Sequence, residues 1–499
     1  MSLPTGFLLL QMNNISNIHF LSKFIVQALQ KVDKTLYVQV IPNSTSVDKL
    51  SYYNHIVNQI YLSASSKKDK VDTRVILSHF RDHLLAKKLT LKSIIVEDGQ
   101  PESPIPDKLI NSSKFGTIQN LANEDKVYQH VVLGGTFDRL HTGHKMLLSA
   151  AILRCETRLT IGVTDGSMIH TKKLWELIEP CQTRIEKLKE FLMDIEPRLE
   201  YNIVPILDPY GPTASDPLLQ MIVVSEETLN GGFKVNDLRK GKNLSVLDIH
   251  PITLVDDIQA SNGEENKISS SSLRKRLLGT HLKPPKVTFL NFEKSKPFVI
   301  GLTGGIASGK TTICNRLKSY GARVISCDHL GHTAYKKGTK CYHQLVEYFG
   351  DQILNADDGE INRKSLGPIV FSNKEHLAKL NSIVWPEIRQ LYLKELEEMK
   401  KEGFDGVVIL DAAILLEAGW DEDCHDVWVT IVPPAEAVQR ISKRDGLSTL
   451  QAEERIASQL SNKERVSRAN VVFCSVWEPE VTAAQVEIAW QFVKSYLAA

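Results

Sequence analysis

The chain has 499 residues, of which 42% are hydrophobic and 24% charged, a composition typical of folded globular proteins. At roughly 150 residues per domain, that length predicts about three domains. The 60 Lys and Arg residues nearly balance the 59 Asp and Glu residues, so the net charge is +1 and no basic excess indicates nucleic acid or an anionic membrane surface.

The seven cysteines include no C-x-x-C pair, which disfavours a disulfide framework or a structural zinc site and fits a reducing compartment. No transmembrane segment is expected, because the most apolar run, residues 407–420, is interrupted by Asp411 and Glu417. The first residues lack the features of a secretory signal and the Arg-rich pattern of a mitochondrial transit peptide. We expect a cytoplasmic protein, and association with mitochondria stays open.

Polar, Pro-rich stretches divide the chain into an N-terminal α/β region (1–125), a second domain (126–279), a linker (280–296) and a third domain (297–499). In the N-terminal region we expect strands at 5–12 and 36–41, a helix at 18–30 and a basic helix at 79–89. No phosphate loop, metal cluster or nucleophile group is found there, so its role is not predicted. The linker contains Pro284-Pro285 and is expected to be exposed, as is a polar loop at 256–267.

The second and third domains alternate short β-branched runs with helical segments, which predicts α/β folds with parallel sheets. Ligands then bind at the carboxyl ends of the strands. In the second domain the expected strands lie at 131–133, 159–163, 203–207 and 222–224, with a helix at 180–195. In the third domain they lie at 298–300, 324–325, 407–410 and 427–431.

A glycine-rich turn and two histidines follow the first strand of the second domain. His141 and His144 form H-x-G-H at the start of a helix, and the three-residue spacing puts both rings on one face. There they can donate to a nucleotide α-phosphate as charge builds during in-line displacement. We predict that both are catalytic, and two structural histidines are the alternative. The nucleotide-binding residues expected before them are Gly134, Gly135, Thr136 and Phe137.

Two further elements of this domain fit a nucleotide. Ser270 and Ser271 precede Arg274, and serine hydroxyls, free N–H groups at a helix start and an arginine suit the departing pyrophosphate. A capped helix with a solvated arginine is the alternative. Lys172 is a candidate catalytic clamp between the donor and acceptor phosphates, or else a surface lysine.

The third domain contains G-x-x-x-x-G-K-[ST] at residues 304–311, between a strand and a helix. The backbone N–H groups of such a loop surround a phosphate, Lys310 supplies charge to the β and γ phosphates, and Thr311 offers a hydroxyl to Mg²⁺. We predict that Lys310 is catalytic and that Thr311 is a metal ligand. The predicted nucleotide-binding residues are Gly304, Gly305, Ile306, Ala307, Ser308, Gly309, Lys310, Thr311 and Thr312.

Other residues of the third domain favour a kinase over a GTPase, because no N-K-x-D guanine reader occurs. Asp328 follows the second strand and can accept a hydroxyl proton in phosphoryl transfer, and a helix N-cap is its alternative role. Asp411 is either a metal or water ligand or a strand-end cap. Arg444 lies in a basic segment (440–468) that forms either a lid over phosphates or a solvated helix face.

The third domain resembles dephospho-coenzyme A kinases through residues 300–310, Cys327-Asp328, residues 363–366 and residues 443–446. The resemblance implies that Asp328 acts as base toward the ribose 3′-hydroxyl and that Arg444 belongs to the lid. Bacterial members usually have His where this chain has Trp385.

The second domain resembles the nucleotidyltransferase superfamily and, through residues 131–139, 207–212 and 223–228, the eukaryotic type of phosphopantetheine adenylyltransferase. Class I aminoacyl-tRNA synthetases share H-x-G-H, but no K-M-S-K-S-like loop is evident here. The order of the two resemblances matches the bifunctional coenzyme A synthase family.

This resemblance implies two reactions. The phosphate of 4′-phosphopantetheine attacks the α-phosphorus of ATP and gives dephospho-coenzyme A, whose ribose 3′-hydroxyl then receives the γ-phosphoryl group of a second ATP. Mg²⁺ is expected at both sites, and no nucleic acid. Two alternatives stay open: a kinase of another metabolite fused to a different nucleotidyltransferase, and a non-catalytic scaffold.

Overall fold

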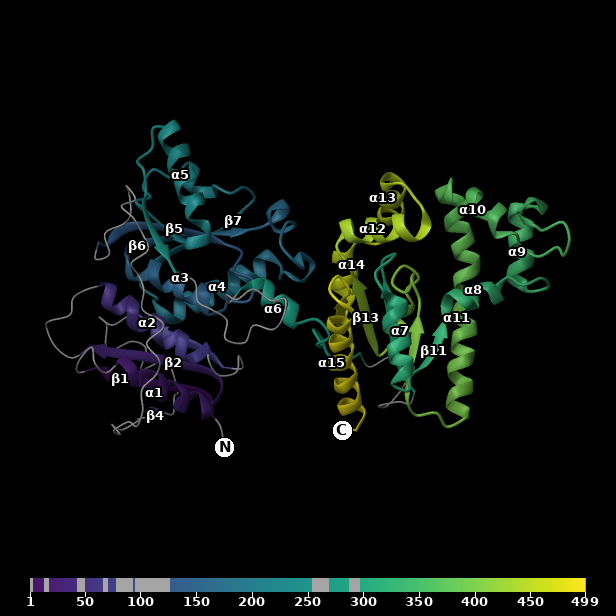
Figure 1. Cartoon of the computed structure of the whole chain (residues 1–499), viewed down its shortest axis with the longest axis horizontal. Coiled ribbons are helices and arrows are strands. Elements are labelled where there is room, and N and C mark those ends of the chain that lie inside the picture. Colours follow the sequence, from purple (N-terminus) through teal and green to yellow (C-terminus); the bar gives the residue numbers. More distant parts are fainter. Residues whose placement is uncertain are drawn as a thin grey trace. The chain divides into compact units, whose positions relative to one another are not determined.

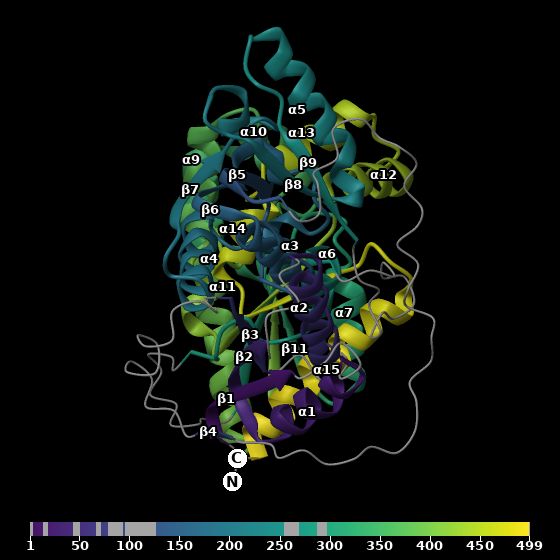
Figure 2. The same cartoon turned by 90° about the vertical axis from the view of Figure 1, so that its left-hand side faces the viewer.

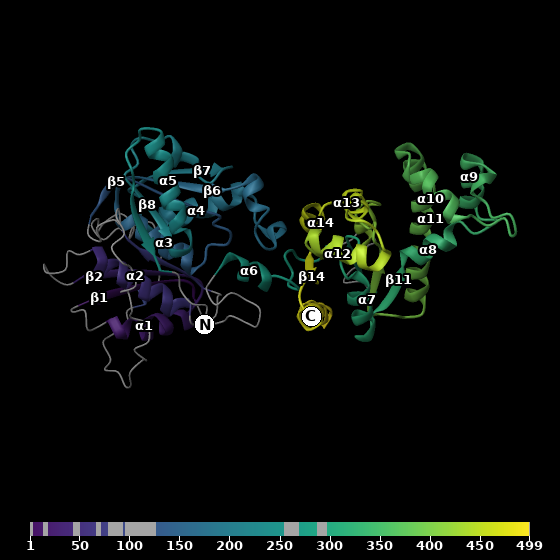
Figure 3. The ribbon, with the colours of Figure 1, turned by 45° about the horizontal axis from the view of Figure 1, so that its top comes forward.

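The computed structural model describes residues 3–12, 18–42, 50–65, 71–77, 93–94, 126–253, 269–286 and 297–498. They belong to two compact units, Met1–Leu273 and Arg274–Ala499 (Figures 1 and 3). No helix within these ranges is long and apolar enough to cross a membrane. The helix predicted at 79–89 and the loop predicted at 256–267 lie outside the described residues.

The N-terminal region forms a parallel sheet in the order β3-β2-β1-β4. Its strands are β1 (Leu3–Met12), β2 (Val32–Pro42), β3 (Asp72–Ile76) and β4 (Ser93–Ile94). Helices α1 (Ile18–Gln30) and α2 (Leu50–Ser65) contact each other beside this sheet (Figure 2). The two strands and the helix predicted there are confirmed, and the region is α/β as expected.

The rest of the first unit is a five-stranded parallel sheet in the order β7-β6-β5-β8-β9. Its strands are β5 (Tyr128–Gly135), β6 (Cys155–Thr164), β7 (Glu200–Ile206), β8 (Met221–Ser225) and β9 (Asp248–Ile252). Its helices are α3 (Thr142–Leu153), α4 (Cys181–Ile195) and α5 (Leu229–Gly241). The order reverses beside β5, the first strand, and ligands of Rossmann-like sheets bind at such a switch point. The four predicted strands are confirmed, and β9 was not predicted.

The two sheets of the first unit share one hydrophobic core. It joins Leu8, Val38 and Ile60 of the N-terminal region to Leu148 of α3 and Phe191 of α4. Helix α2 packs against α3, and β3 packs against α4. The N-terminal region is therefore packed on the helices that cover one face of the second sheet.

The second unit contains a parallel sheet in the order β11-β12-β10-β13-β14. Its strands are β10 (Phe298–Gly304), β11 (Arg323–Ser326), β12 (Val407–Asp411), β13 (Asp426–Ile431) and β14 (Val471–Cys474). Its helices are α7 (Lys310–Ser319), α8 (Cys327–Ala334), α9 (Lys340–Phe349), α10 (Arg363–Phe371), α11 (Lys374–Lys401), α12 (Pro434–Asp445), α13 (Thr449–Ala457), α14 (Asn462–Arg468) and α15 (Pro479–Ala498). The four predicted strands are confirmed. β10, wholly buried at the centre, delivers the phosphate loop at its carboxyl end.

Residues 279–286, hereafter the strap, run along the edge strand β14. The Leu282 N–H donates to the Asn470 carbonyl at 2.7 Å, and His281 forms an antiparallel bridge with Val471. His281 Nε2 also lies 2.6 Å from Oδ2 of the fully buried Asp426. The strap thus covers backbone groups that an edge strand would otherwise expose.

The strap contains the described part of the predicted linker, residues 280–286. Lys283 and Pro284 are exposed, as expected for a linker, while hydrogen bonds to β14 hold the strap, which lies in the second unit. Residues 287–296, the remainder of the predicted linker, lie outside the described residues.

Candidate active sites

The histidine pair lies at the carboxyl end of β5, where α3 begins. His141 is the N-cap of α3 in an extended conformation, and His144 lies in the first turn. Their rings stack with centroids 3.8 Å apart, and the Phe137 ring lies 5.2 Å from that of His144. The structure therefore brings both predicted histidines to one place on one helix end.

Burial sets the protonation state of His144. Its Nδ1 atom is shielded from solvent without a hydrogen-bond partner among the described residues. Desolvation lowers the pKa of His144 to about 4, although the Asp138 carboxylate acts in the opposite direction. At neutral pH the ring is therefore uncharged and can donate one N–H. An arriving phosphate would favour its charged form.

The glycine-rich turn before the histidines is held by a residue that the sequence did not single out. Arg184 of α4 is fully buried, and its Nη1 donates to the carbonyls of Thr136 and Thr164 at 2.6 and 2.9 Å. Phe137 and Arg139 in the same turn adopt positive φ values of 48° and 52°, a strained conformation that clusters at functional sites. A lone arginine in an amphipathic helix carries no sequence signal for this role.

The serine segment lies beside the histidines. Ser270 Oγ donates to the Asp138 carbonyl at 3.1 Å and lies 3.4 Å from His141 Nε2. Helix α6 (Ser270–Arg276) starts at Ser270, so Ser270 and Ser271 form its first turn rather than preceding it as predicted. Arg274 is fully buried and is the first residue of the second unit.

Lys172 is not brought to this site by any contact within the described part of the chain. It lies exposed in a turn, where its backbone N–H bonds to Ile169. Gly134 and Gly135 end β5, and a Cβ on Gly135 would lie 3.1 Å from the Phe137 ring, so that position favours glycine.

In the second unit, a cavity of about 770 Å³ surrounds the phosphate loop. Its lining comes from segments that are far apart in the sequence. They are the phosphate loop, the start of α8, the segment after β12, α12 and the segment after α13. The lining residues are Gly304, Gly305, Ile306, Ala307, Ser308, Gly309, Lys310, Thr311, Asp328, Ala413, Arg440, Lys443, Arg444 and Gln459. The predicted Lys310, Asp328 and Arg444 therefore share one cavity, whereas Thr312 does not line it.

The loop has the tight geometry that phosphate loops need. Gly309 has a φ of +89°, and a Cβ on Gly304 would lie 2.4 Å from Thr430 Cγ2 and 2.6 Å from Ser308 Oγ. Ala307 has a positive φ of 60° without being glycine. The Ser308 carbonyl accepts from Thr430 Oγ1 at 2.9 Å and from Ser475 Oγ at 2.7 Å. Two neighbouring strand ends thus fix the loop.

The charged groups of the cavity differ in how they are held. Lys310 forms an ion pair with Asp411, which ends β12. Asp328 is exposed in the first turn of α8, and the N-cap of that helix is Ser326, so capping does not explain Asp328. Arg444 is 58% exposed and pairs with Asp445.

Sequence comparisons match two parts of the chain to known families. Residues 298–475 match the model of dephospho-CoA kinase, and residues 132–276 match that of cytidylyltransferase-like proteins. A dephospho-CoA kinase from Geobacter sulfurreducens is 40% identical over 192 residues, covering 38% of this chain and 96% of that protein. The chain belongs to the dephospho-CoA kinase family.

A second relative and one solved structure are also similar to this chain. A dephospho-CoA kinase from Moorella thermoacetica is 36% identical over 201 residues, covering 40% of this chain and 94% of that protein. The solved dephospho-CoA kinase from Campylobacter jejuni is 26% identical, covers 39% of this chain and 96% of that chain, and has a TM-score of 0.32. The kinase family and the cytidylyltransferase-like match together fit a bifunctional coenzyme A synthase.

Within the kinase unit, two residues that were not among the predicted site residues bind the phosphate loop. Gln459 Oε1 accepts the Ile306 N–H at 2.9 Å. Arg440 donates to the Ala307 carbonyl at 3.2 Å and to Ser475. Arg440 lay in the predicted basic segment, but nothing in the sequence marked Gln459.

The basic segment is neither wholly lid nor wholly solvated. Arg440, Lys443 and Arg444 line the cavity. Arg465 is 2% exposed and pairs with Glu417 at 3.4 Å. Trp385, where the chain departs from the bacterial members, is a half-buried residue of α11 next to Pro386 inside that helix.

Proposed function

We propose that this chain catalyses two successive steps, adenylyl transfer to 4′-phosphopantetheine and phosphorylation of the dephospho-coenzyme A that results. The observation that carries the proposal is the kinase cavity, where Lys310, Asp328 and Arg444 meet at the phosphate loop of a dephospho-CoA kinase family member. The dephospho-coenzyme A acceptor consists of an adenylate joined to phosphopantetheine. A nucleotidyltransferase on the same chain that adds adenylate would supply it.

In the kinase step, the backbone of the loop would surround the phosphates of ATP, and Lys310 would exchange Asp411 for the β and γ phosphates. Asp328, exposed at the cavity, would accept the proton of the ribose 3′-hydroxyl. Arg440, Lys443 and Arg444 would stabilise the charge of the transferring phosphoryl group.

The oxygen atoms near Lys310 fit Mg²⁺. Thr311 lines the cavity, and the Asp411 carboxylate is paired with Lys310, which lines the same cavity. Mg²⁺ is usually bound by one or two protein oxygens together with substrate phosphates, so no larger cluster of acidic residues is required. Thr311 and Asp411 would hold the ion, which would offset the negative charge of the phosphates of ATP.

The acceptor would approach from α8, beyond Asp328. His332, one turn after Asp328, contacts Arg363 of α10, and the Arg363 guanidinium lies 5.2 Å from the centre of the Tyr335 ring. Burial and then Arg363 lower the pKa of His332. These groups offer donors for the phosphates of dephospho-coenzyme A.

In the adenylyl step, His141 and His144 would donate to the α-phosphate of ATP, and Ser270 to the departing pyrophosphate. Ser270 Oγ lies 3.4 Å from His141 Nε2, which supports contacts of the two side chains with neighbouring phosphates of one nucleotide. Mg²⁺ at this site rests on the family alone. A uridylyl- or cytidylyltransferase would use the same groups, so the nucleotide must be tested.

The decisive experiment incubates the protein with 4′-phosphopantetheine, Mg²⁺ and either ATP or CTP, followed by mass analysis of the products. The proposal expects dephospho-coenzyme A and then coenzyme A with ATP. Transfer of cytidylate alone would contradict the adenylyl step, and failure to phosphorylate supplied dephospho-coenzyme A would contradict the kinase step.

A further inference from the structure

The helix that carries His144 is buried on both of its faces. Every residue of α3 from 145 to 152 is buried, and residues 146–152 include no charged residue. A helix that covers only one face of a sheet normally shows polar residues on its other face. One face of α3 packs on β5, β6 and β8, and α2 of the N-terminal region covers the other.

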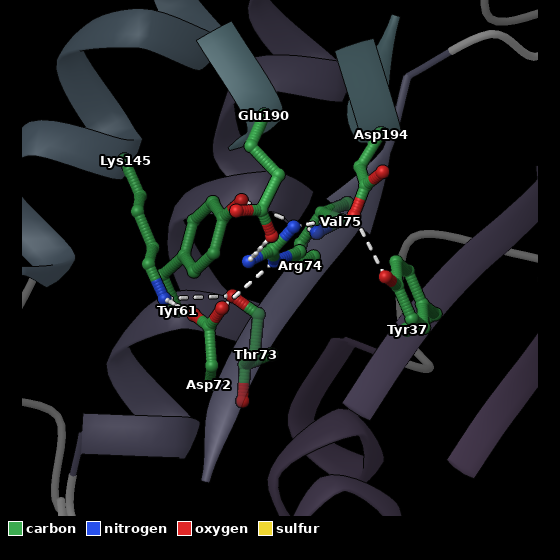
Figure 4. Close-up of polar contacts among 9 residues, drawn as sticks. All are labelled: Tyr37, Tyr61, Asp72, Thr73, Arg74, Val75, Lys145, Glu190 and Asp194. Atoms are coloured by element: carbon green, nitrogen blue, oxygen red, sulfur yellow. Dashed lines mark hydrogen bonds and ion pairs between the residues drawn. The ribbon is translucent and has the colours of Figure 1, made fainter. Parts of the chain in front are cut away.

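Lys145, the residue after His144, makes polar contacts between α3 and the N-terminal region (Figure 4). Its ammonium group forms an ion pair with Asp72 of β3 and donates to the Thr73 carbonyl at 3.0 Å. It lies 6.0 and 5.9 Å from the ring centres of Tyr61 and Phe191. A lysine that is only 8% exposed needs such a partner, because an unpaired buried charge is strongly unfavourable.

The same short strand holds the second helix of the site. Arg74 bridges Asp72 at 2.7 Å and Glu190 of α4 at 3.1 Å, and it also pairs with Asp194 (Figure 4). The Tyr37 hydroxyl donates to Asp194 at 2.7 Å. Helix α4 also supplies Arg184, which fixes the turn before the histidines. β3 therefore holds both helices on which the histidine site depends.

We propose that the N-terminal region is a working part of the adenylyltransferase site, in which Asp72 and Lys145 are positioning residues that act through His144. The inference rests on the proposed adenylyl transfer. Without its partner, the Lys145 ammonium group must turn toward water, and the first turn of α3 must move with it. A displacement of about 1 Å at a reacting group can reduce a rate roughly 10²-fold.

Because a shared apolar core also holds the N-terminal region, the ion pair between Lys145 and Asp72 should affect the position of α3 rather than the folding of the unit. Ile60, Leu148 and Phe191 join the N-terminal region to α3 and α4 independently of Lys145. Loss of the ion pair should therefore leave the region docked but the histidines less well placed.

The test compares Lys145→Met and Asp72→Asn with a matched control in the full-length chain. The control, Arg158→Met, breaks the ion pair of Arg158 on β6 with Asp216, 2.6 Å long with side chains 19% and 20% exposed. We expect kcat for dephospho-coenzyme A formation to fall about 10-fold or more in both test variants, with the KM for ATP changing much less. Arg158→Met should keep its kcat, and all variants should phosphorylate supplied dephospho-coenzyme A normally.

The double variant, Lys145→Met with Asp72→Asn, adds a check on coupling. Its loss should be smaller than the product of the two single losses, because both substitutions remove the ion pair between Lys145 and Asp72. An unchanged kcat in Asp72→Asn, or a loss in Arg158→Met equal to that in Lys145→Met at matched melting temperature, would overturn the inference. A wild-type chain that forms no dephospho-coenzyme A would instead overturn the proposed function.

Discussion

The two nucleotide sites of this chain are supported in different ways. In the kinase unit, the phosphate loop is fixed by Thr430, Arg440 and Ser475, all within residues 298–475 that match the kinase family. In the first unit, the helices of the histidine site are held from Asp72 and Arg74, outside the matched residues 132–276. A family match can therefore contain the reacting groups of a site and still omit the residues that position them.

This difference bears on how each site can be impaired. The kinase site should respond mainly to changes in its own cavity. The histidine site should respond both to its reacting groups and to a region that carries no motif.

The largest effect is expected at the kinase base. Asp328→Asn should reduce phosphorylation of dephospho-coenzyme A by about 10²-fold to 10⁴-fold, because a general base is lost while the loop that binds ATP is unchanged. Product analysis should show dephospho-coenzyme A accumulating from 4′-phosphopantetheine. Asp357→Asn, the same substitution at an exposed aspartate outside the cavity lining, is the control. Normal coenzyme A output from Asp328→Asn would remove Asp328 from the mechanism.

A somewhat smaller effect is expected at the histidine site. His144→Ala should reduce pyrophosphate release roughly 10²-fold to 10³-fold, the effect of losing one donor to a developing phosphate charge. The same protein should phosphorylate supplied dephospho-coenzyme A at the wild-type rate. A parallel loss of both activities would show that the two sites do not work independently.

The motifs were predictable from sequence because each lies on one continuous segment. The strand before Gly304 and the helix after it placed the phosphate loop, and the spacing of His141 and His144 placed both rings on one helix end. Asp328 could be assigned to the same site because the carboxyl ends of parallel strands lie along one edge of a sheet, and ligands bind there.

What could not be predicted depends on pairs distant in the chain. Lys145 and Asp72, 73 residues apart, are ordinary charged residues until the fold joins them. The uncharged run at residues 146–152 is a sequence signal that α3 is buried on both faces. His281 and Asp426 are 145 residues apart, so the contact that ties the strap to β13 could not be predicted from the sequence.

The strap gives a prediction about stability in the kinase unit. His281→Ala leaves Asp426, which is fully buried, with one hydrogen bond fewer, although Trp428 Nε1 still donates to it at 2.8 Å. The free energy of unfolding should fall by about 2 kcal/mol. Urea unfolding followed by tryptophan fluorescence suits this test, because Trp420 and Trp428 are buried in this unit.

Lys283→Ala is the matched control within the strap. Lys283 is exposed and its ammonium group donates to the Ser467 carbonyl, so its loss should change the free energy of unfolding by less than about 0.5 kcal/mol. Equal stability of His281→Ala and Lys283→Ala would mean that the strap is held by its backbone alone.

The smallest effect per residue concerns the pH dependence of stability in the first unit. Burial lowers the pKa of His144 to about 4, and burial together with Arg154 lowers that of His250 to about 3. Because both folded-state values lie below the unfolded value of about 6.5, the stabilisation is present above pH 6.5 and is lost as the pH falls toward 4. At pH 5.5 each histidine should contribute a loss of up to about 1.4 kcal/mol in the free energy of unfolding.

Hydrogen exchange of peptides from β5 and β8, measured at pH 7.5 and 5.5 with correction for intrinsic rates, reports this loss directly. His250→Asn should remove about half of the pH dependence, and stability of these strands that does not change with pH would show that neither ring is held uncharged by the fold.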